Sequence, residues 1–192
     1  MLYNKQSLQL IEFYHYKIIK LSNYQIIKLS NNTNKMDIEK TIEALNSLIV
    51  INNDRIEGYK TANEETKETD LKMLFSQLSQ TSIECRKELV GEVTRLGGTP
   101  EEGTRTTGKF FRVWMDVKAA LTGNDRKAIL DSCEYGEDAA LETYKNVLIQ
   151  DYHETNLKEQ NMLNKHYALL KADHDKVKEL RDAIANEKKL TE

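Results

Sequence analysis

Along most of this 192-residue chain, apolar residues recur at alternating spacings of four and three, and this spacing restricts the possible folds more than any other feature. It places the apolar residues on one face of an α-helix, whereas a strand needs alternation at every second residue. The first stripe covers residues 37–63 and consists of Ile38, Ile42, Leu45, Ile49, Asn52, Ile56 and Tyr59. With one proline, eight glycines and 31% charged residues, the composition also favours long helices over sheet. The sequence therefore predicts an all-α protein.

Four long helices and one short helix are expected. The long helices are predicted at about residues 37–63, 70–96, 125–150 and 155–184, each roughly 40 Å long at 1.5 Å per residue. Gly97, Gly98 and Pro100 end the second helix, because glycine supplies a C-cap and proline cannot continue a helix. The connection that follows carries the short helix, at residues 109–121. Short turns within each pair of helices and one long connection between the pairs predict a four-helix bundle with a crossover.

The boundary between the last two helices is harder to place. No glycine or proline separates them, so one continuous helix is the alternative. Continuing the stripe of the third helix past Val147 gives only polar positions, namely Asp151, Glu154, Lys158, Asn161 and Lys165. Because the apolar phase is lost there, we predict a turn at residues 151–154.

Residues 1–35 differ from the rest of the chain. Residues 16–23 and 24–31 form a tandem octapeptide with seven of eight positions identical, which is too few copies for a solenoid. We expect an N-terminal extension that is poorly ordered or foreign to the natural protein, with Met36 as the natural start and residues 36–192 as the bundle. The alternative is a basic amphipathic segment that lies on a membrane surface.

Charge and cysteine content narrow the expected partners and location. Residues 1–35 carry a charge of +4, and because the whole chain carries −3, residues 36–192 carry −7. An acidic body gives no electrostatic reason to expect nucleic acid. The two cysteines, Cys85 and Cys133, lie on apolar stripes and suit buried free thiols in a reducing cytoplasm. We expect a cytoplasmic homo-oligomer that contacts no membrane, unless residues 1–35 are native and amphipathic.

One charged residue interrupts an apolar stripe. The third long helix presents Leu130, Cys133, Glu137, Ala140, Tyr144 and Val147 on its inner face. A carboxylate at a core position and the mid-helix Gly136 beside it both cost stability, so both require a reason. Gly136 and Gly58 are expected to permit close approach of helices.

Hairpin symmetry places further polar groups at the height of Glu137. Residues equidistant from a turn lie side by side, which pairs Glu57 with Glu84, and Glu137 with Lys171 and His174. These residues are therefore expected in one or two layers near the centre of the bundle.

This order of acids and histidine resembles the ferritin-like superfamily. Bacterioferritins and rubrerythrins hold two irons with Glu, Glu-x-x-His, Glu and Glu-x-x-His on successive helices. Within that superfamily, the chain is similar to a bacterial four-helix-bundle family of unknown function. The similarity covers about residues 36–184. It depends on His174 in the fourth long helix and on three segments, Leu96-Gly97-Gly98-Thr99-Pro100, Trp114-Met115-Asp116-Val117-Lys118 and Cys133-Glu134-Tyr135-Gly136-Glu137-Asp138. The resemblance implies a ferritin-like bundle with a remnant metal site at Glu57, Glu84, Glu137 and His174.

Two lysines depart from the pattern of that superfamily. Lys87 stands where a ligand histidine is expected, and Lys171 where a ligand glutamate is expected. A protonated amine cannot bind a metal ion and repels it. We therefore expect internal ion pairs between these lysines and the acids in place of the two metals.

The functional expectation follows from that loss. We expect a non-catalytic, oligomeric or stress-associated protein whose di-iron site has degenerated and which needs no cofactor. The alternative is a metal-binding protein or oxidase that retains a reduced iron site. No nucleophile–base pair, phosphate-binding loop or zinc spacing is present, so no catalytic residue is assigned. His174 is expected to be a hydrogen-bonded core residue, His153 and His166 surface residues, and Trp114 the residue that packs the short helix onto the bundle.

Overall fold

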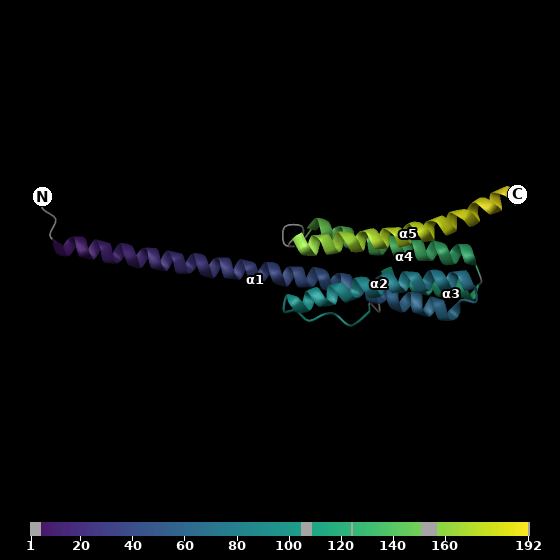
Figure 1. Cartoon of the computed structure of the whole chain (residues 1–192), viewed down its shortest axis with the longest axis horizontal. Helices are drawn as coiled ribbons and strands as arrows, with labels where there is room; N and C mark the ends of the chain where they lie inside the picture. The colour runs from purple at the N-terminus through teal and green to yellow at the C-terminus, as the bar shows by residue number, and fades with distance from the viewer. Residues whose placement is uncertain (1–4, 105–108, 124, 151–156, 192) are drawn as a thin grey trace. The chain divides into compact units, whose positions relative to one another are not determined.

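The computed structural model describes residues 5–104, 109–123, 125–150 and 157–191, and all of its regular structure is helical there. This confirms the all-α prediction. The helices, which Figure 1 labels, are α1 (Lys5–Glu65), α2 (Thr69–Arg95), α3 (Lys109–Thr122), α4 (Arg126–Gln150) and α5 (Leu157–Thr191). Among the described residues, no helix is both long and apolar enough to cross a membrane.

The chain divides into two compact units, Met1–Lys40 and Thr41–Glu192. The first long helix was predicted to start at about residue 37, but α1 begins at Lys5 and runs through the boundary between the units. Whether residues 1–35 belong to the natural protein stays a prediction. The remaining description concerns the second unit, which we call the bundle unit.

In the bundle unit, α1 and α2 pair as an antiparallel hairpin. The Asn63 side chain donates to the Lys72 carbonyl at 2.8 Å near the turn, and Arg86 donates to Asn53 farther from it. The chain then returns along α1, because the amides of Asn46 and Asn53 donate to the carbonyls of residues 99 and 103. This returning segment is the first part of the predicted long connection.

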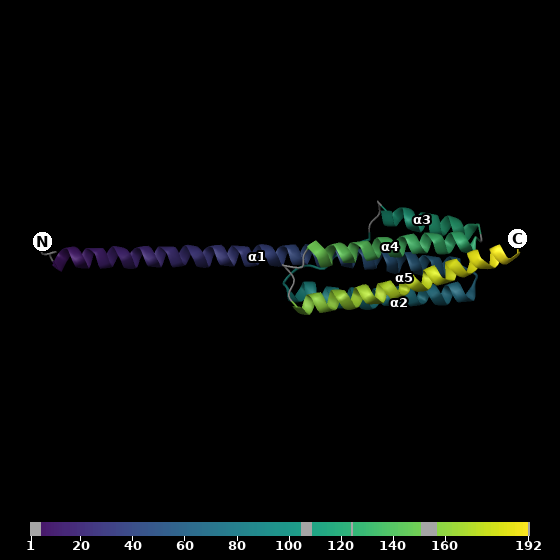
Figure 2. The same cartoon turned by 90° about the horizontal axis from the view of Figure 1, so that it is seen from above.

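The second half of the bundle unit is the pair α4 and α5, which lie side by side in both views, with α3 packed on α4 (Figure 1 and Figure 2). The predicted turn at 151–154 lies outside the described residues. The two helices are nevertheless folded back on each other, since Arg181 of α5 pairs with Glu134 of α4. The alternative of one continuous helix is therefore wrong.

Helix ends follow the sequence signals closely. Gly97 adopts φ +82°, and the N–H groups of Gly97 and Gly98 donate to the carbonyls of Thr94 and Val93. That pair of bonds is a Schellman motif, which requires a left-handed residue and so favours glycine. At the start of α4, the Asp125 carboxylate accepts from the N–H of Ala128 at 3.0 Å and caps the helix.

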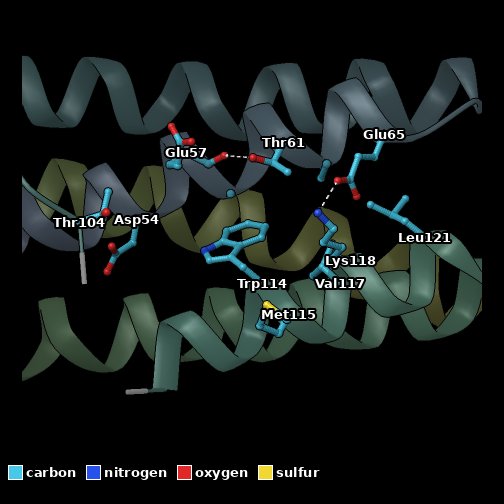
Figure 3. Close-up of a pocket in the computed structure, with 12 residues that line it drawn as sticks. Asp54, Glu57, Thr61, Glu65, Thr104, Trp114, Met115, Val117, Lys118 and Leu121 are labelled. Atoms are coloured by element: carbon cyan, nitrogen blue, oxygen red, sulfur yellow. Dashed lines mark hydrogen bonds and ion pairs between the residues drawn. The ribbon is translucent and has the colours of Figure 1, made fainter. Parts of the chain in front are cut away.

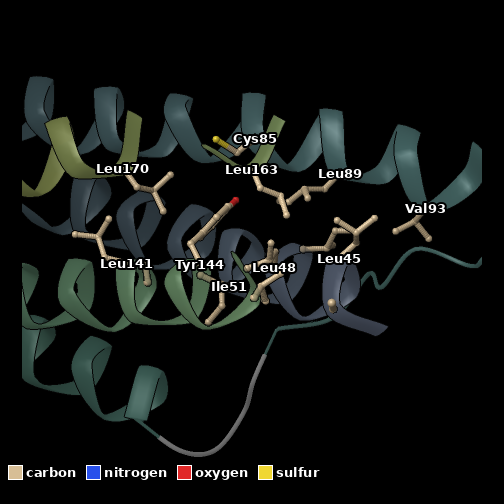
Figure 4. Close-up of a cluster of buried hydrophobic side chains, with 14 residues drawn as sticks. Leu45, Leu48, Ile51, Cys85, Leu89, Val93, Leu141, Tyr144, Leu163 and Leu170 are labelled. Atoms are coloured by element: carbon tan, nitrogen blue, oxygen red, sulfur yellow. The ribbon is translucent and has the colours of Figure 1, made fainter. Parts of the chain in front are cut away.

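Two apolar clusters fill the bundle unit on either side of its middle. Figure 4 shows one of them, where side chains of α1, α2, α4 and α5 point toward one another. Its labelled members are Leu45, Leu48, Ile51, Cys85, Leu89, Val93, Leu141, Tyr144, Leu163 and Leu170. The other cluster adds residues of α3, including Val113 and Val117. The polar groups described below lie at the same helix heights as the boundary between the clusters.

Both glycines that were expected to allow close helix approach do so, and both face α3. A Cβ atom on Gly58 of α1 would lie 1.8 Å from a ring carbon of Trp114, and one on Gly136 of α4 would lie 3.0 Å from Val113 Cγ1. The Trp114 ring also meets the Tyr59 ring edge-on, with centroids 4.9 Å apart. Trp114 thus packs the short helix onto the bundle, as predicted.

Candidate functional site

A buried guanidinium lies at the centre of the bundle unit. Arg55 of α1 is 1% exposed, and its Nη2 donates to both carboxylate oxygens of Glu137, at 2.9 and 2.8 Å. Its Nε donates to Glu137 Oε1 at 3.2 Å, and its Nη1 donates to the Ser82 hydroxyl at 2.7 Å. A second acid, Asp173, lies 3.3 Å from Nη2. All four long helices therefore contribute a group to one polar layer.

Tyr59 completes this layer. Its hydroxyl donates to Glu137 Oε1, so the Glu137 carboxylate is bound by both Tyr59 and Arg55. Burial, reinforced by the charge of Glu137, raises the pKa of Tyr59 well above its ordinary value. The phenol therefore stays protonated and remains a donor. We call Arg55, Tyr59, Ser82, Glu137 and Asp173 the central polar layer.

The charges of the central polar layer respond to burial in opposite ways. Burial disfavours the charged form of Arg55, but Glu137, Tyr59 and Asp173 together outweigh this effect and raise the pKa of Arg55 above its ordinary value. For Asp173, burial is the larger effect and raises the pKa to about 6, although the facing Arg55 opposes the shift. The guanidinium thus donates to both oxygens of Glu137, whereas the second acid, Asp173, contacts it through one oxygen at 3.3 Å.

The structure brings only part of the predicted metal site together. Glu137 is fully buried, and His174 is 8% exposed with its Nε2 3.0 Å from Asp138 Oδ1. Glu57 and Glu84 are exposed on α1 and α2 instead of facing the centre. Within the described part of the chain, no three His, Cys, Asp or Glu side chains are grouped as metal ligands. Metal binding at Glu57, Glu84, Glu137 and His174 stays a prediction, and the described part of the structure does not bring these four side chains together.

The predicted lysine partners are wrong. Lys171 pairs with Asp175 on the exposed face of α5, and Lys87 is exposed on α2. The buried carboxylate pairs with Arg55. An arginine suits that place better, because its planar fork binds both carboxylate oxygens at once and its charge survives burial.

Sequence reasoning missed Arg55 and Asp173 because both are charged. Spacing alone did not separate the buried stripe from the predicted one. The buried positions of α1 follow the four–three rhythm through Thr41, Leu45, Leu48, Asn52, Arg55, Tyr59 and Ala62. The predicted stripe alternates four and three in the same way, but it took Ile56 where the buried stripe has Arg55, and Ile56 is only half-buried. On α5, the same rhythm runs through Glu159, Leu163, His166, Leu170, Asp173 and Val177.

His166 is a related correction. It was predicted at the surface but is 1% exposed, and its Nε2 lies 3.2 Å from Glu88 on α2. Burial lowers its pKa, although Glu88 opposes the shift. The predicted stripe had placed Tyr167 on the inner face of α5, and Tyr167 is half-buried. His174 is a hydrogen-bonded core residue, as expected, and His153 lies outside the described residues.

The chemistry that the central polar layer can perform is limited. Arg55 keeps its proton, and burial raises the pKa of the Cys85 thiol to about 12 and that of Cys133 above its ordinary value. Neither thiol is therefore a nucleophile at neutral pH. The groups of the layer are already hydrogen-bonded to one another, so the layer is suited to holding the helices together.

Comparisons with known proteins identify a family but no activity. Residues 40–150 match a family described as a domain of unknown function (DUF2383). That range contains the three segments that carried the resemblance to a family of unknown function. No curated protein matches the chain. Since the match covers more than half of the residues, the chain belongs to the DUF2383 family.

Proposed function

We propose that this protein is a non-catalytic helical bundle of ferritin-like architecture in which a protein cation stands where its metal-binding relatives hold iron. The observation that supports this is the placement of Arg55. Its guanidinium contacts groups from α2, α4 and α5 while it is carried by α1. Di-iron proteins of the ferritin-like superfamily likewise use ligands from four helices at mid-bundle. The guanidinium therefore replaces the metal charge.

Electrostatics give the reason why such a centre excludes iron. A divalent ion at Glu137 would have to displace the guanidinium or bind beside it, and both are costly in a desolvated centre. Arg55 cannot escape by losing its proton, because the nearby acids hold its pKa above the ordinary value. The hypothesis of an internal ion pair in place of metal is thus kept, with Arg55 in the role first given to two lysines.

The test is iron loading of the full chain. The protein is incubated anaerobically with Fe(II), exposed to air and separated from free iron, and bound iron and oxygen consumption are then measured. We expect bound iron far below one ion per chain and no oxygen consumption above the buffer rate. Near-stoichiometric iron together with oxygen consumption would overturn the proposal in favour of the alternative, a metal-binding protein or oxidase.

A substitution makes the same test sharper. Arg55→Gln removes the internal cation but keeps a polar side chain of similar length beside Glu137 and Asp173. If the guanidinium is what excludes metal, this variant should bind more divalent metal than the natural chain. Lys171→Gln, which removes a cation from the exposed face of α5, is the matched control and should change nothing. Equal metal binding by all three proteins would contradict the proposal.

The proposed assembly is a small homo-oligomer. Large apolar side chains such as Met73, Ile83 and Leu169 are exposed on the bundle unit and are available for contacts between copies. Light scattering on the full chain after gel filtration tests this. A mass equal to one chain over the whole concentration range would contradict it.

A further inference from the structure

A pocket lies between α1 and α3, and none of its lining residues belongs to the central polar layer (Figure 3). Its volume is about 300 Å³. The indole of Trp114 forms one wall, and Ala62, Val117 and Leu121 add apolar surface. A concave, mostly apolar pocket with a few polar groups is the usual form of a small-molecule site.

The Trp114 wall is held in place by its surroundings. The ring lies over Gly58, where a Cβ would approach ring atoms to about 2 Å, and it meets the Tyr59 ring edge-on. Its Nε1 is buried and has no hydrogen-bond partner among the described residues. The indole therefore forms a fixed aromatic surface beside the pocket.

The polar groups that line the pocket are mainly acidic. Asp54, Glu57 and Glu65 contribute carboxylates, and Lys118 is the one cation among the described lining residues. The Lys118 Nζ lies 3.1 Å from Glu65 Oε1, so the charges of these two residues largely cancel each other. The remaining charge that the described lining residues contribute is negative. It complements a cation and repels an anion.

An aromatic wall and a negative rim together define a class of ligand. The face of an indole attracts a cation that lies within about 6 Å, and tryptophan does so more strongly than tyrosine or phenylalanine. An apolar body against Ala62, Val117 and Leu121 would be removed from water, which contributes about 25 cal/mol per Å² of buried apolar surface. We propose that this pocket binds a small amine with an apolar body, its ammonium directed to the carboxylates near Glu57.

The chain supplies its own reporter for the test. Trp114 is the only tryptophan, so the protein has one indole N–H signal in its NMR spectrum, and that signal comes from the wall of the pocket. The full chain labelled with ¹⁵N is titrated with 2-phenylethylamine and, in parallel, with 3-phenylpropanoate. These probes have nearly the same size and apolar ring but opposite charges. We expect a saturable shift of the indole signal with the amine. The carboxylate should bind at least tenfold more weakly, which corresponds to a difference of about 1.4 kcal/mol in binding free energy.

Two pairs of variants separate pocket binding from general effects. Glu57→Gln should weaken the amine severalfold, whereas Glu84→Gln, which removes an equally exposed charge from α2, should not. Thr61→Phe fills the pocket and should abolish binding of the amine. Thr94→Phe is its control, because Thr94 lies exposed on α2 and its hydroxyl donates four residues back, as that of Thr61 does. An indole signal that does not move, or equal affinity for the two probes, would overturn the proposal.

Discussion

The guanidinium of Arg55 and the carboxylate of Glu137 face each other through three hydrogen bonds of 2.8 to 3.2 Å, and neither side chain is more than 1% exposed. The two residues are 82 positions apart and join α1 to α4. A buried pair of this kind loses the hydration of both charges, so it need not add net stability. Removing one partner is different, because the other charge is then left buried and uncompensated.

The first prediction concerns Glu137. Glu137→Ala leaves Arg55 without its bidentate acceptor and should lower the free energy of unfolding by about 3–5 kcal/mol. Glu137→Gln should cost less, because its amide oxygen still accepts from Arg55 and from Tyr59. Urea unfolding followed by circular dichroism measures both, with the exposed Glu84→Ala as a control that should change stability by less than about 0.5 kcal/mol. Equal tolerance of Ala and Gln at position 137 would show that the pair is not structural.

The second prediction tests whether Arg55 and Glu137 act as a unit. Arg55→Met alone leaves a buried carboxylate and should destabilise strongly, as Glu137→Met should by leaving a buried cation. The double variant removes both charges and supplies apolar groups, so it should be more stable than either single variant. The coupling energy comes from the four unfolding curves of the double-mutant cycle. Losses that simply add would mean that the two side chains do not interact.

The spacing of apolar residues was enough to predict the order of the helices in the bundle unit and the height of the polar layer, but not the start of α1 at Lys5 or the end of α5 at Thr191. α2, α3 and α4 begin and end within two residues of the predicted positions, because capping residues and Gly97 act locally. Hairpin symmetry placed Glu57 and Glu84 close to the height of Glu137. It failed at the faces of the helices, since an error of one residue on a helix rotates a side chain by about 100°. Glu57 and Glu84 therefore lie at the surface although their heights are close to the layer.

A general rule that charged residues lie at the surface was the cause of the larger error. Arg55 and Asp173 occupy buried stripe positions, and the predicted stripes, which alternate four and three in the same way, took Ile56 and His174 in their place. The rhythm also could not show that the glycines serve α3, because the contact of Gly58 with Trp114 joins segments that no local pattern connects. Long-range packing of this kind is where sequence spacing carries no information.

The third prediction concerns pH. The pKa of Asp173 is about 6 in the folded protein because of burial, and that of an unperturbed aspartate is about 4. The folded state therefore binds more protons than the unfolded chain between these values, and this residue makes the free energy of unfolding fall by up to about 3 kcal/mol as the pH rises from 4 to 7. Asp173→Asn should remove that contribution. Its stability relative to the natural chain should be greater at pH 7 than at pH 4.5, as measured by urea unfolding.

Asp175, two residues after Asp173, is a control whose pKa shift has the opposite sign. The hydrogen bond from Lys171 lowers the pKa of Asp175, so this exposed residue favours the folded state above the pKa of an unfolded aspartate. Asp175→Asn should therefore lose stability relative to the natural chain as the pH rises. If both variants show the same pH trend, the assignment of the raised pKa to Asp173 is incorrect.

The fourth prediction compares two helical glycines. At Gly91 of α2 nothing lies within 4 Å of an added Cβ, so Gly91→Ala should stabilise by about 0.5–1 kcal/mol through helix propensity. Gly58→Ala gains the same propensity, but its methyl group would overlap the Trp114 ring. Overpacking typically costs about 1–3 kcal/mol, so this variant should be destabilised overall. Because Trp114 is the only tryptophan, its fluorescence should shift to longer wavelength in Gly58→Ala and stay unchanged in Gly91→Ala.

The last prediction concerns the first 35 residues. The buried positions of the bundle unit begin at Thr41, the boundary between the two units falls after Lys40, and the family match begins at residue 40. In residues 15–40, the side chains that the structure describes are exposed, apart from the half-buried Asp37. A chain that begins at Met36 removes no buried apolar side chain among those that the structure describes, so its free energy of unfolding should equal that of the full chain within about 0.5 kcal/mol. Thermal and urea unfolding of the two chains provide the comparison. A large drop in melting temperature on truncation would show that residues 1–35 are part of the folded protein. It would then favour the alternative that this segment lies on a membrane surface, which flotation with anionic liposomes tests directly.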